Sequence, residues 1–331
     1  MLPLLFIALC IGCGSEPFYD LTSPSWYLLL ATDTPELQLR HEPGNSVVVS
    51  DLYAQANGSP LPAPVQDMEL FRNTLFLFLP KSVELLDANS YKRRARLHLP
   101  ASPDGIAFPN ATSGYIWHRS AGMLSLIDLL TDEYVRTFSI GGQIGAVAAS
   151  DAMLYITEEK SSYLLVFDTR TWQVQDSLPL PPRPRFIALR EGAQELVVAS
   201  IGSGDDSAAT LRAPRLSLIR LRPLRLVKSI PLSTSADSAR IRLTGLVTTP
   251  DDFAYVGTSA GLFRVDLRSQ GSIRLVQQWN IRNLWYLPNR GEFWFLTAGT
   301  PQQLIIAAGS RAEPILSTSL PSGTTALLPL P

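Results

Sequence analysis

Short runs in which apolar residues alternate with polar ones recur along most of the chain, and turn-forming residues separate them. Alternation over about 4–8 residues is typical of a half-buried β-strand. The middle of the chain predicts four consecutive strands, at residues 144–149, 153–157, 162–167 and 173–180. The stretch before it predicts four more, at residues 104–108, 114–118, 123–127 and 134–140. Because no segment sustains a helical apolar period over about 12 residues, the sequence predicts an all-β protein.

A short motif marks the end of the third strand in these groups: an aliphatic or aromatic residue, Asp, two further residues, and Ser or Thr. Its aspartates are Asp87, Asp128, Asp168 and Asp266, and the first three are 41 and 40 residues apart. An Asp at a strand end can accept hydrogen bonds from backbone N–H groups two or three residues later, which closes a hairpin turn. We interpret these carboxylates as structural turn residues rather than catalytic groups, because a repeat requires equivalent turns.

Equivalent positions without Asp complete the series. Arg40 begins it, Arg220 lies in the long gap after Asp168, and Ala307 follows Asp266, which gives seven marks spaced 40–52 residues apart. A period of this length with four strands per unit predicts a β-propeller. The expected fold is therefore a seven-bladed β-propeller of four-stranded antiparallel blades.

The two ends of the chain are predicted to share one blade. Residues 26–30, 36–40 and 46–50 supply three strands, and residues 324–330 predict an innermost fourth strand that closes the ring. The repeat pattern resembles the seven-bladed, YVTN-like propellers of bacterial envelope proteins over about residues 26–330. That resemblance implies a fold, and it does not specify a function.

The N-terminus predicts export and a lipid anchor. The apolar run at residues 2–11 is too short to span a bilayer, which needs about 20 residues, and it fits the apolar region of a secretory signal. It runs into Gly12-Cys13-Gly14, which resembles the lipobox of bacterial lipoproteins and implies lipidation of Cys13. Cys10 stands where the lipobox prefers an aliphatic residue, and no Lys or Arg precedes the run. An ordinary secretory signal with a chance cysteine is the alternative.

This interpretation divides the chain into a signal peptide at 1–12, a lipidated cysteine with a tether at 13–25, and a propeller at 26–331. The expected location is the cell envelope, with the lipid on Cys13 as the membrane contact. By analogy with enteric lipoproteins, Gly14 favours the outer membrane. The only cysteines are Cys10 and Cys13, so a disulfide framework and a cysteine-based metal site are excluded.

The 28 basic and 29 acidic residues give a net charge of −1. The chain as a whole is therefore not attracted to nucleic acid, and we expect no nucleic-acid partner. Residues 183–242 differ from this balance, with 11 basic and 5 acidic residues. Guanidinium groups recognise carboxylates and phosphates, so this segment is a candidate for binding an anionic partner. The candidate residues are Arg183, Arg185, Arg220, Arg222 and Arg225. The simpler alternative, which we favour, is that arginine alternates with leucine because one sheet face is exposed to water.

The innermost strands of a propeller line its central channel, and the strands predicted here contain few residues that could catalyse a reaction or bind a metal. Innermost strands are expected at residues 145–149, 186–189, 243–247 and 325–328, and they are nearly free of ionisable groups. Asp67 and Glu69 are the exception. Lactonase-like propellers need several carboxylate or amide ligands from different blades on one metal, and no such set is visible. His41, His98 and His118 are expected to be isolated, and residues 202–206 are expected to be an insertion rather than a cation loop.

We therefore expect no metal, no cofactor and no catalytic residue. The leading hypothesis is a membrane-anchored envelope lipoprotein whose propeller is a non-catalytic scaffold for another envelope protein or an extracellular ligand. One alternative is a lactonase-like propeller hydrolase of the envelope. The other is a polyanion-binding module that uses the arginine-rich fifth blade.

Overall fold

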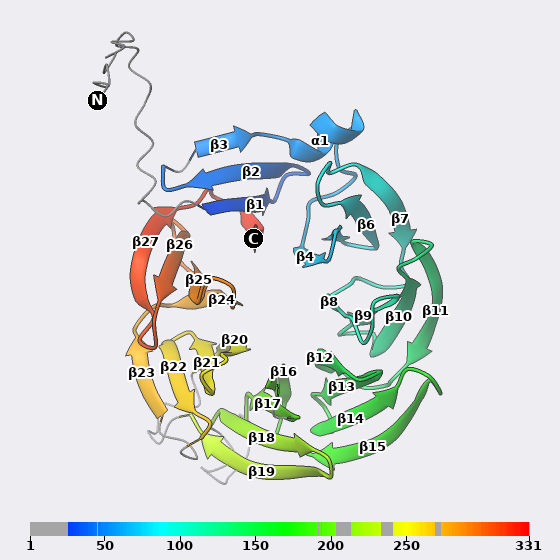
Figure 1. Ribbon diagram of the computed structural model, residues 1–331, viewed down its shortest axis with the longest axis vertical. Helices are drawn as coiled ribbons and strands as arrows, with labels where there is room; N and C mark the ends of the chain where they lie inside the picture. The colour runs from blue at the N-terminus through cyan, green and yellow to red at the C-terminus, as the bar shows by residue number, and fades with distance from the viewer. Residues whose placement is uncertain are drawn as a thin grey trace, which may run out of the picture.

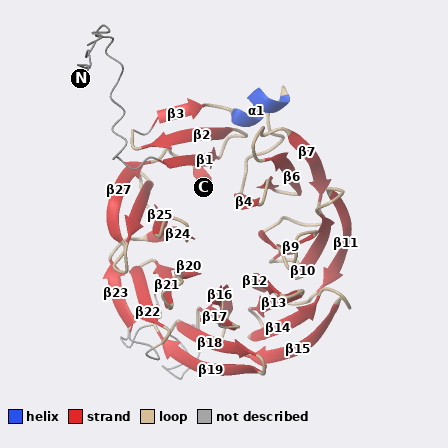
Figure 2. Ribbon diagram, viewed as in Figure 1, coloured by secondary structure: helices blue, strands red, loops and turns tan. Residues whose placement is uncertain are grey.

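Seven four-stranded antiparallel sheets surround a central axis in the computed structural model, which describes residues 26–44, 46–190, 192, 194–202, 213–232, 241–268 and 273–330 (Figure 1). The seven-bladed β-propeller predicted from the repeat is confirmed. Strands dominate the described ranges, and the short α1 (Leu52–Asn57) is their one α-helix (Figure 2). The predicted signal peptide, Cys13, the tether and most of residues 202–206 lie outside the described residues.

In each blade the strands are called A to D, from the innermost to the outermost. Blade 1 contains β28 (Thr324–Pro329), β1 (Trp26–Thr32), β2 (Leu37–Glu42) and β3 (Ser46–Val49); blade 2 contains β4 (Asp67–Phe71), β5 (Thr74–Leu79), β6 (Ser82–Asp87) and β7 (Arg93–His98). Blade 3 contains β8 (Gly105–Ala107), β9 (Ser113–His118), β10 (Met123–Asp128) and β11 (Glu133–Ser139); blade 4 contains β12 (Ile144–Ser150), β13 (Met153–Glu158), β14 (Tyr163–Asp168) and β15 (Gln173–Pro179).

Blade 5 contains β16 (Pro184–Arg190), β17 (Glu195–Ser200), β18 (Arg215–Leu221) and β19 (Leu224–Pro231). Blade 6 contains β20 (Leu243–Thr248), β21 (Phe253–Thr258), β22 (Gly261–Asp266) and β23 (Ile273–Gln277). Blade 7 contains β24 (Ile281–Leu287), β25 (Glu292–Thr297), β26 (Gln303–Ala308) and β27 (Glu313–Ser319).

The hydrophobic core is divided into clusters, each of which lies between two neighbouring blades. Successive side chains of a strand point to opposite faces of its sheet. Strand β5 therefore sends Leu75, Leu77 and Leu79 toward blade 1, whereas Phe76 and Phe78 pack toward blade 3. This arrangement explains why the B strands are apolar at nearly every position, because both faces are covered.

The chain ends close the ring as the sequence predicted. Strand β28 pairs antiparallel with β1, and Leu327 lies opposite Leu30. Both leucines are fully buried in the cluster between blades 1 and 7. The indole N–H of Trp26 donates to Glu292 Oε2 of blade 7 over 2.9 Å, so the first described residue is held to the last blade.

The motif aspartates lie at the ends of the C strands of blades 2, 3, 4 and 6. Each accepts a hydrogen bond from the backbone N–H two residues later, over 2.8 Å in three turns and 3.2 Å in the fourth. The pairs are Asp87–Asn89, Asp128–Leu130, Asp168–Arg170 and Asp266–Arg268. These hydrogen bonds fix the turn between strands C and D.

One helix was not expected from the sequence. Helix α1 lies in the connection from blade 1 to blade 2, with Asp51 as its N-cap and Gly58 in the left-handed conformation at its C-terminus. Tyr53 on this helix is fully buried, and its hydroxyl donates to Glu84 over 3.3 Å. Six residues are too few for a helical period to be recognised in the sequence. Across the described ranges, no helix has the length and apolar character required to cross a bilayer.

Candidate binding site at one end of the ring

The two ends of the ring are formed by different connections. Each inner strand begins at the connection from the preceding blade and ends where the chain turns toward strand B. We call the end that carries the starts of the inner strands the D–A face. The opposite end, which carries the turns between strands A and B and between strands C and D, is called the A–B face.

The five candidate arginines of blade 5 do not form one patch. Arg183 and Arg185 lie at the start of β16 on the D–A face, whereas Arg220, Arg222 and Arg225 surround the turn between β18 and β19 on the A–B face. Three of them already face carboxylates. Arg185 donates to Glu159 over 2.9 Å, Arg220 lies 3.8 Å from Glu195, and Arg222 lies 3.7 Å from Asp151.

The inner strands carry more charge than the sequence suggested. Residues 186–189, the innermost strand expected for blade 5, contain no ionisable group, but β16 extends to Arg185 and Arg190 on either side of them. Strand β24 includes Arg282, so the inner strands as a whole are not nearly free of ionisable groups. A shift in strand register places Arg185 and Arg282. The pairing of the A and B strands shifts at the second inner-strand residue of blades 5 and 7, so Arg185 and Arg282 have no partner opposite them in the ladder. Such bulges re-aim a side chain.

A guanidinium pair lies on the D–A face between blades 3 and 5. Arg119 and Arg185 both donate to Glu159 Oε1, over 3.1 and 2.9 Å, and Arg119 also donates to the carbonyl of Gly145 over 2.8 Å. Burial, and secondly the charge of Arg185, lower the pKa of Arg119. A Cβ on Gly145 would lie 2.4 Å from the carbonyl oxygen of Pro184, so only glycine permits this close approach of blades 4 and 5.

Asp67 and Glu69 lie at alternate positions of the inner strand β4. Met68 between them packs into the core, so the two carboxylates point away from it and are exposed. The surrounding protein leaves them incompletely hydrated, and this desolvation raises the pKa of Asp67 to about 6. Desolvation, with repulsion from Asp67, raises the pKa of Glu69 to about 7.

Replacing Glu69 should therefore have a pH-dependent effect on stability. A carboxyl whose pKa is higher in the folded state stabilises the fold at acidic pH, and that contribution disappears as the pH rises through the folded value. We expect Glu69→Gln to leave the Tm unchanged below pH 4.5 and to raise it by a few degrees above pH 7. Calorimetry across this range tests the prediction, with exposed Glu36→Gln as the control. Equal effects at both pH values would contradict it.

The A–B face is hollowed over blades 5, 6 and 7. The first hollow has a volume of about 390 Å³ and lies between the ends of β16, β20 and β24, where Leu189, Val247, Pro250 and Pro288 form apolar walls. A second hollow of about 240 Å³ lies between blades 6 and 7. A third of about 270 Å³ follows the flank between blades 5 and 6, from Arg190 at the A–B end to Ile230 nearer the D–A end. Tyr286 borders the first and second hollows.

A row of ion pairs joins blades 5 and 6 beside these hollows. Arg190 donates to Asp252 Oδ1 from Nε and Nη2, over 2.8 and 2.6 Å, and to Glu195 Oε2 from Nη1 over 2.6 Å. Arg268 donates to the other oxygen of Asp252, and Arg220 approaches the other oxygen of Glu195. We call these five residues the Arg190 ladder. Hydrogen bonds from Arg268 and then Arg190 lower the pKa of Asp252.

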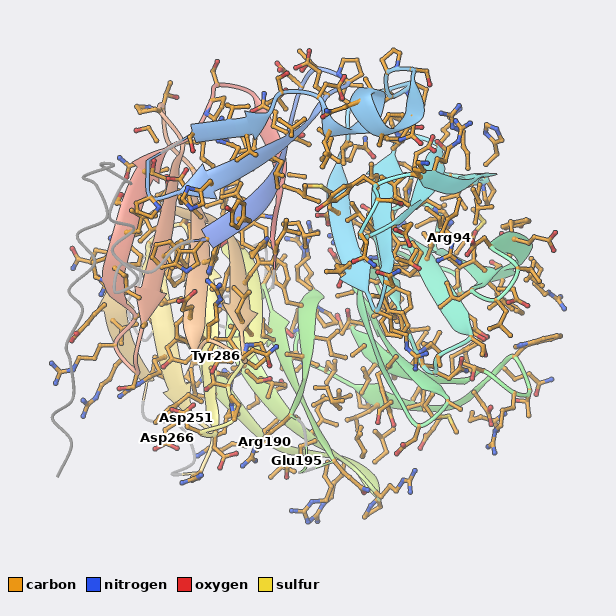
Figure 3. All side chains as sticks on the ribbon, turned by 45° about the horizontal axis from the view of Figure 1, so that its top comes forward. Arg94, Arg190, Glu195, Asp251, Asp266 and Tyr286 are labelled. Atoms are coloured by element: carbon orange, nitrogen blue, oxygen red, sulfur yellow. The ribbon has the colours of Figure 1, made fainter. Side chains whose placement is uncertain are left out.

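Figure 3 shows Tyr286, Asp251, Asp266, Arg190 and Glu195 gathered on one side of the ring, while Arg94 of β7 lies on the opposite side. We call the three hollows and the Arg190 ladder the A–B site. Sequence reasoning missed this site. One part of the ladder could have been predicted from the sequence, because Arg190 and Glu195 lie on either side of the short turn from β16 to β17 and pair across it. The contact with Asp252 depends on how blade 6 stacks against blade 5.

The histidines lie on three different blades. His41 is on β2, His98 is on β7, and His118 is on β9. His118 is buried, with its ring nitrogens 3.0 Å from the carbonyl of Ser102 and 2.8 Å from the hydroxyl of Ser125. Within the described ranges, no group of three or more His, Cys, Asp and Glu side chains is placed to hold a metal ion.

Comparisons with known proteins identify a fold. No protein-family model and no curated protein matches the sequence. Hydrazine synthase of Kuenenia stuttgartiensis matches with a TM-score of 0.65 at 14% identity, covering 79% of this chain and 88% of that chain. The U3-55K structure matches at 0.64 and 11% identity, covering 82% and 85%. The Pan2 WD40 domain of Neurospora crassa matches at 0.60 and 12% identity, covering 81% and 82%. Such low identities support the propeller fold alone.

Proposed function

We propose that this protein is a membrane-anchored envelope lipoprotein whose propeller is a non-catalytic scaffold, and that the A–B site binds its protein partner. The observation that carries the proposal is the combination of apolar hollows with an ordered row of charges on one face of blades 5–7. Protein interfaces combine an apolar, often aromatic centre with charged surroundings in this way. The propeller fold itself is compatible with a protein-interaction role.

The chemistry of the ladder favours binding over catalysis. Each carboxylate lies between two guanidinium groups, Asp252 between Arg190 and Arg268, and Glu195 between Arg190 and Arg220. A carboxylate held in this way is a poor general base and a poor metal ligand, because both of its oxygens already face cations. The ladder instead provides a rigid pattern of charge, and such patterns contribute specificity and faster association at interfaces.

The lipid anchor proposed on Cys13 would place the A–B site near the membrane. Trp26 lies at the A–B end of β1 and is held there by Glu292. The 13 peptide steps from Cys13 to Trp26 span at most about 45 Å when fully extended. The chain therefore enters the propeller on the face that carries the A–B site, and a partner in the same membrane would lie within reach.

A propeller hydrolase remains the second candidate, and one observation favours it. Carboxyl groups with pKa values near neutrality are suited to general acid–base catalysis, and Asp67 and Glu69 lie exposed on an inner strand with values of about 6 and 7. A panel of ester and lactone substrates tests this candidate. Hydrolysis that is lost in Glu69→Gln and kept in Glu36→Gln would favour the hydrolase over the scaffold.

Photo-crosslinking in the producing cells tests the scaffold. A photoreactive amino acid in place of Tyr286 should give one discrete crosslinked protein, whereas the same residue in place of exposed Val135 on β11 should give none. Val247→Arg, which fills the first hollow with a charge, should abolish the product, and Cys13→Ser should reduce it. Equal crosslinking from positions 286 and 135, or a product that Val247→Arg leaves unchanged, would refute the proposed interface.

A further inference from the structure

The second hollow of the A–B site differs chemically from its neighbours. Three aromatic rings meet at its wall: the centroids of Tyr255 and Phe293 are 4.4 Å apart, and those of Tyr286 and Phe293 are 4.9 Å apart, both in tilted arrangements. Tyr255 and Phe293 are almost completely buried, so their positions are fixed by the core between blades 6 and 7. Tyr286 is partly exposed and forms the boundary with the first hollow.

Asp251 supplies a carboxylate to the same hollow. It precedes Asp252 in the turn between β20 and β21, and it accepts a hydrogen bond from the hydroxyl of Thr249. Within the described part of the chain Asp251 forms no ion pair, in contrast to Asp252, which lies between two arginines. Burial raises the pKa of Tyr255 to about 12, and the charge of Asp251 adds to this shift. The phenols therefore stay neutral, and Asp251 is the one charged residue among the described residues that line the hollow, while the positive charge of Arg264 lies nearby.

An aromatic wall beside a carboxylate is the arrangement that recognises an alkylammonium or guanidinium group. One cation already lies beside the hollow. The guanidinium of Arg264 is 4.6 Å from the centroid of the Phe253 ring, which is outside the wall of the hollow, and it donates to the carbonyl of Ser310, which lines the hollow, over 2.8 Å. The remaining space of about 240 Å³ lies next to Asp251 and Tyr286, and its aromatic walls can cover an aliphatic stem.

We propose that this hollow receives a basic side chain, a lysine, from the protein partner of the A–B site. The partly exposed ring of Tyr286, which the buried Phe293 supports, contacts the methylene stem, and the carboxylate of Asp251 receives the ammonium group. We assign the lysine to a protein rather than the ammonium to a lipid headgroup, because the adjoining first hollow and the Arg190 ladder extend the site over three blades. This inference rests on the proposed partner-binding role.

The test uses Nα-acetyl-lysine methylamide as the probe and the full-length protein labelled with meta-fluorotyrosine. The fluorine NMR signal of Tyr286 is assigned by its absence in Tyr286→Phe. The signal should shift saturably with the lysine amide and much less with the neutral norleucine amide. Asp251→Asn should weaken binding roughly fivefold, while Asp176→Asn on the outer strand β15 should leave it unchanged. Arg264→Gln should strengthen binding, because it removes a nearby positive charge.

Three results would overturn the inference: no saturable shift, equal shifts with the lysine and norleucine amides, or binding that Asp251→Asn does not weaken. Vesicles of phosphatidylcholine provide a separate arm. A shift with vesicles but not with the lysine amide would assign the ammonium group to a lipid and reject the protein lysine. Because this measurement needs no partner, its failure is distinguishable from a failure of the crosslinking that tests the scaffold itself.

Discussion

Leu327→Ala is expected to lower the free energy of unfolding by about 3 kcal/mol, the usual cost of a cavity left by a fully buried leucine. Leu327 lies on β28, pairs with Leu30 of β1, and belongs to the buried cluster between blades 1 and 7 that also contains Trp26 and Trp294. The substitution therefore weakens the contact through which the ends of the chain close the ring. Thermal or denaturant unfolding measures the loss, and we expect a fall in Tm of roughly 5–10 °C.

Ile315→Ala is the matched control. Ile315 lies on the outer strand β27 of blade 7 and is 47% exposed, so its truncation leaves little cavity. Its effect should stay within about 0.5 kcal/mol. If Leu327→Ala were no more destabilising than Ile315→Ala, closure by the C-terminal strand would not contribute to the stability of the ring.

Arg190→Ala is expected to have the second large effect, a loss of about 2–3 kcal/mol in the free energy of unfolding. The Arg190 side chain is 17% exposed, and removing it leaves Asp252 and Glu195 close together without the guanidinium that bridges them. Asp252 keeps its contact with Arg268 and Glu195 keeps Arg220 at 3.8 Å, but each carboxylate loses its more buried partner. Breaking a partly buried ion pair costs more than the pair itself contributes. The comparison is Arg170→Ala: its side chain is 73% exposed, so its ion pair with Asp168 should matter far less.

The loss at Arg190 should also depend on pH. The pKa of Asp252 is held below its usual 3.8 by Arg268 and Arg190. A carboxyl with a lowered pKa stabilises the fold above its unfolded value, and that contribution disappears as the pH falls through the folded value. The stability difference between the native protein and Arg190→Ala should therefore be largest near neutrality and shrink below about pH 4. A difference that does not change with pH would contradict the proposed electrostatic origin.

The repeat made the fold accessible from the sequence. Each motif Asp ends a strand and accepts a hydrogen bond from the backbone of the turn that follows it. The motif therefore reflects local structure, and it can be recognised without knowledge of the tertiary structure. The positions of Arg40, Arg220 and Ala307 fall in C strands as well, which shows that spacing identified blades even where the aspartate was absent. The C-terminal strand was predictable because the N-terminal segment supplied only three strands of blade 1, and residues 324–330 had the pattern of a fourth.

The A–B site could not be predicted in the same way. Arg190, Asp252 and Arg268 come together only because blades 5 and 6 pack side by side with a particular offset. The bulges that aim Arg185 and Arg282 into new positions depend on the register between neighbouring strands, which alternation alone does not specify. Composition suggested an arginine-rich blade, but the structure divides those arginines between opposite ends of the ring.

The central proposal, that the A–B site is held near the membrane and binds a partner there, is tested most directly by cysteine labelling in cells. Asn289→Cys lies in the turn between β24 and β25 on the A–B face, and Glu36→Cys lies between β1 and β2 on the opposite face; both positions are exposed. A bulky maleimide should modify position 36 readily in all samples. Position 289 should be protected in the anchored protein and become reactive when Cys13→Ser releases it. Equal modification of both positions in the anchored protein would contradict the account.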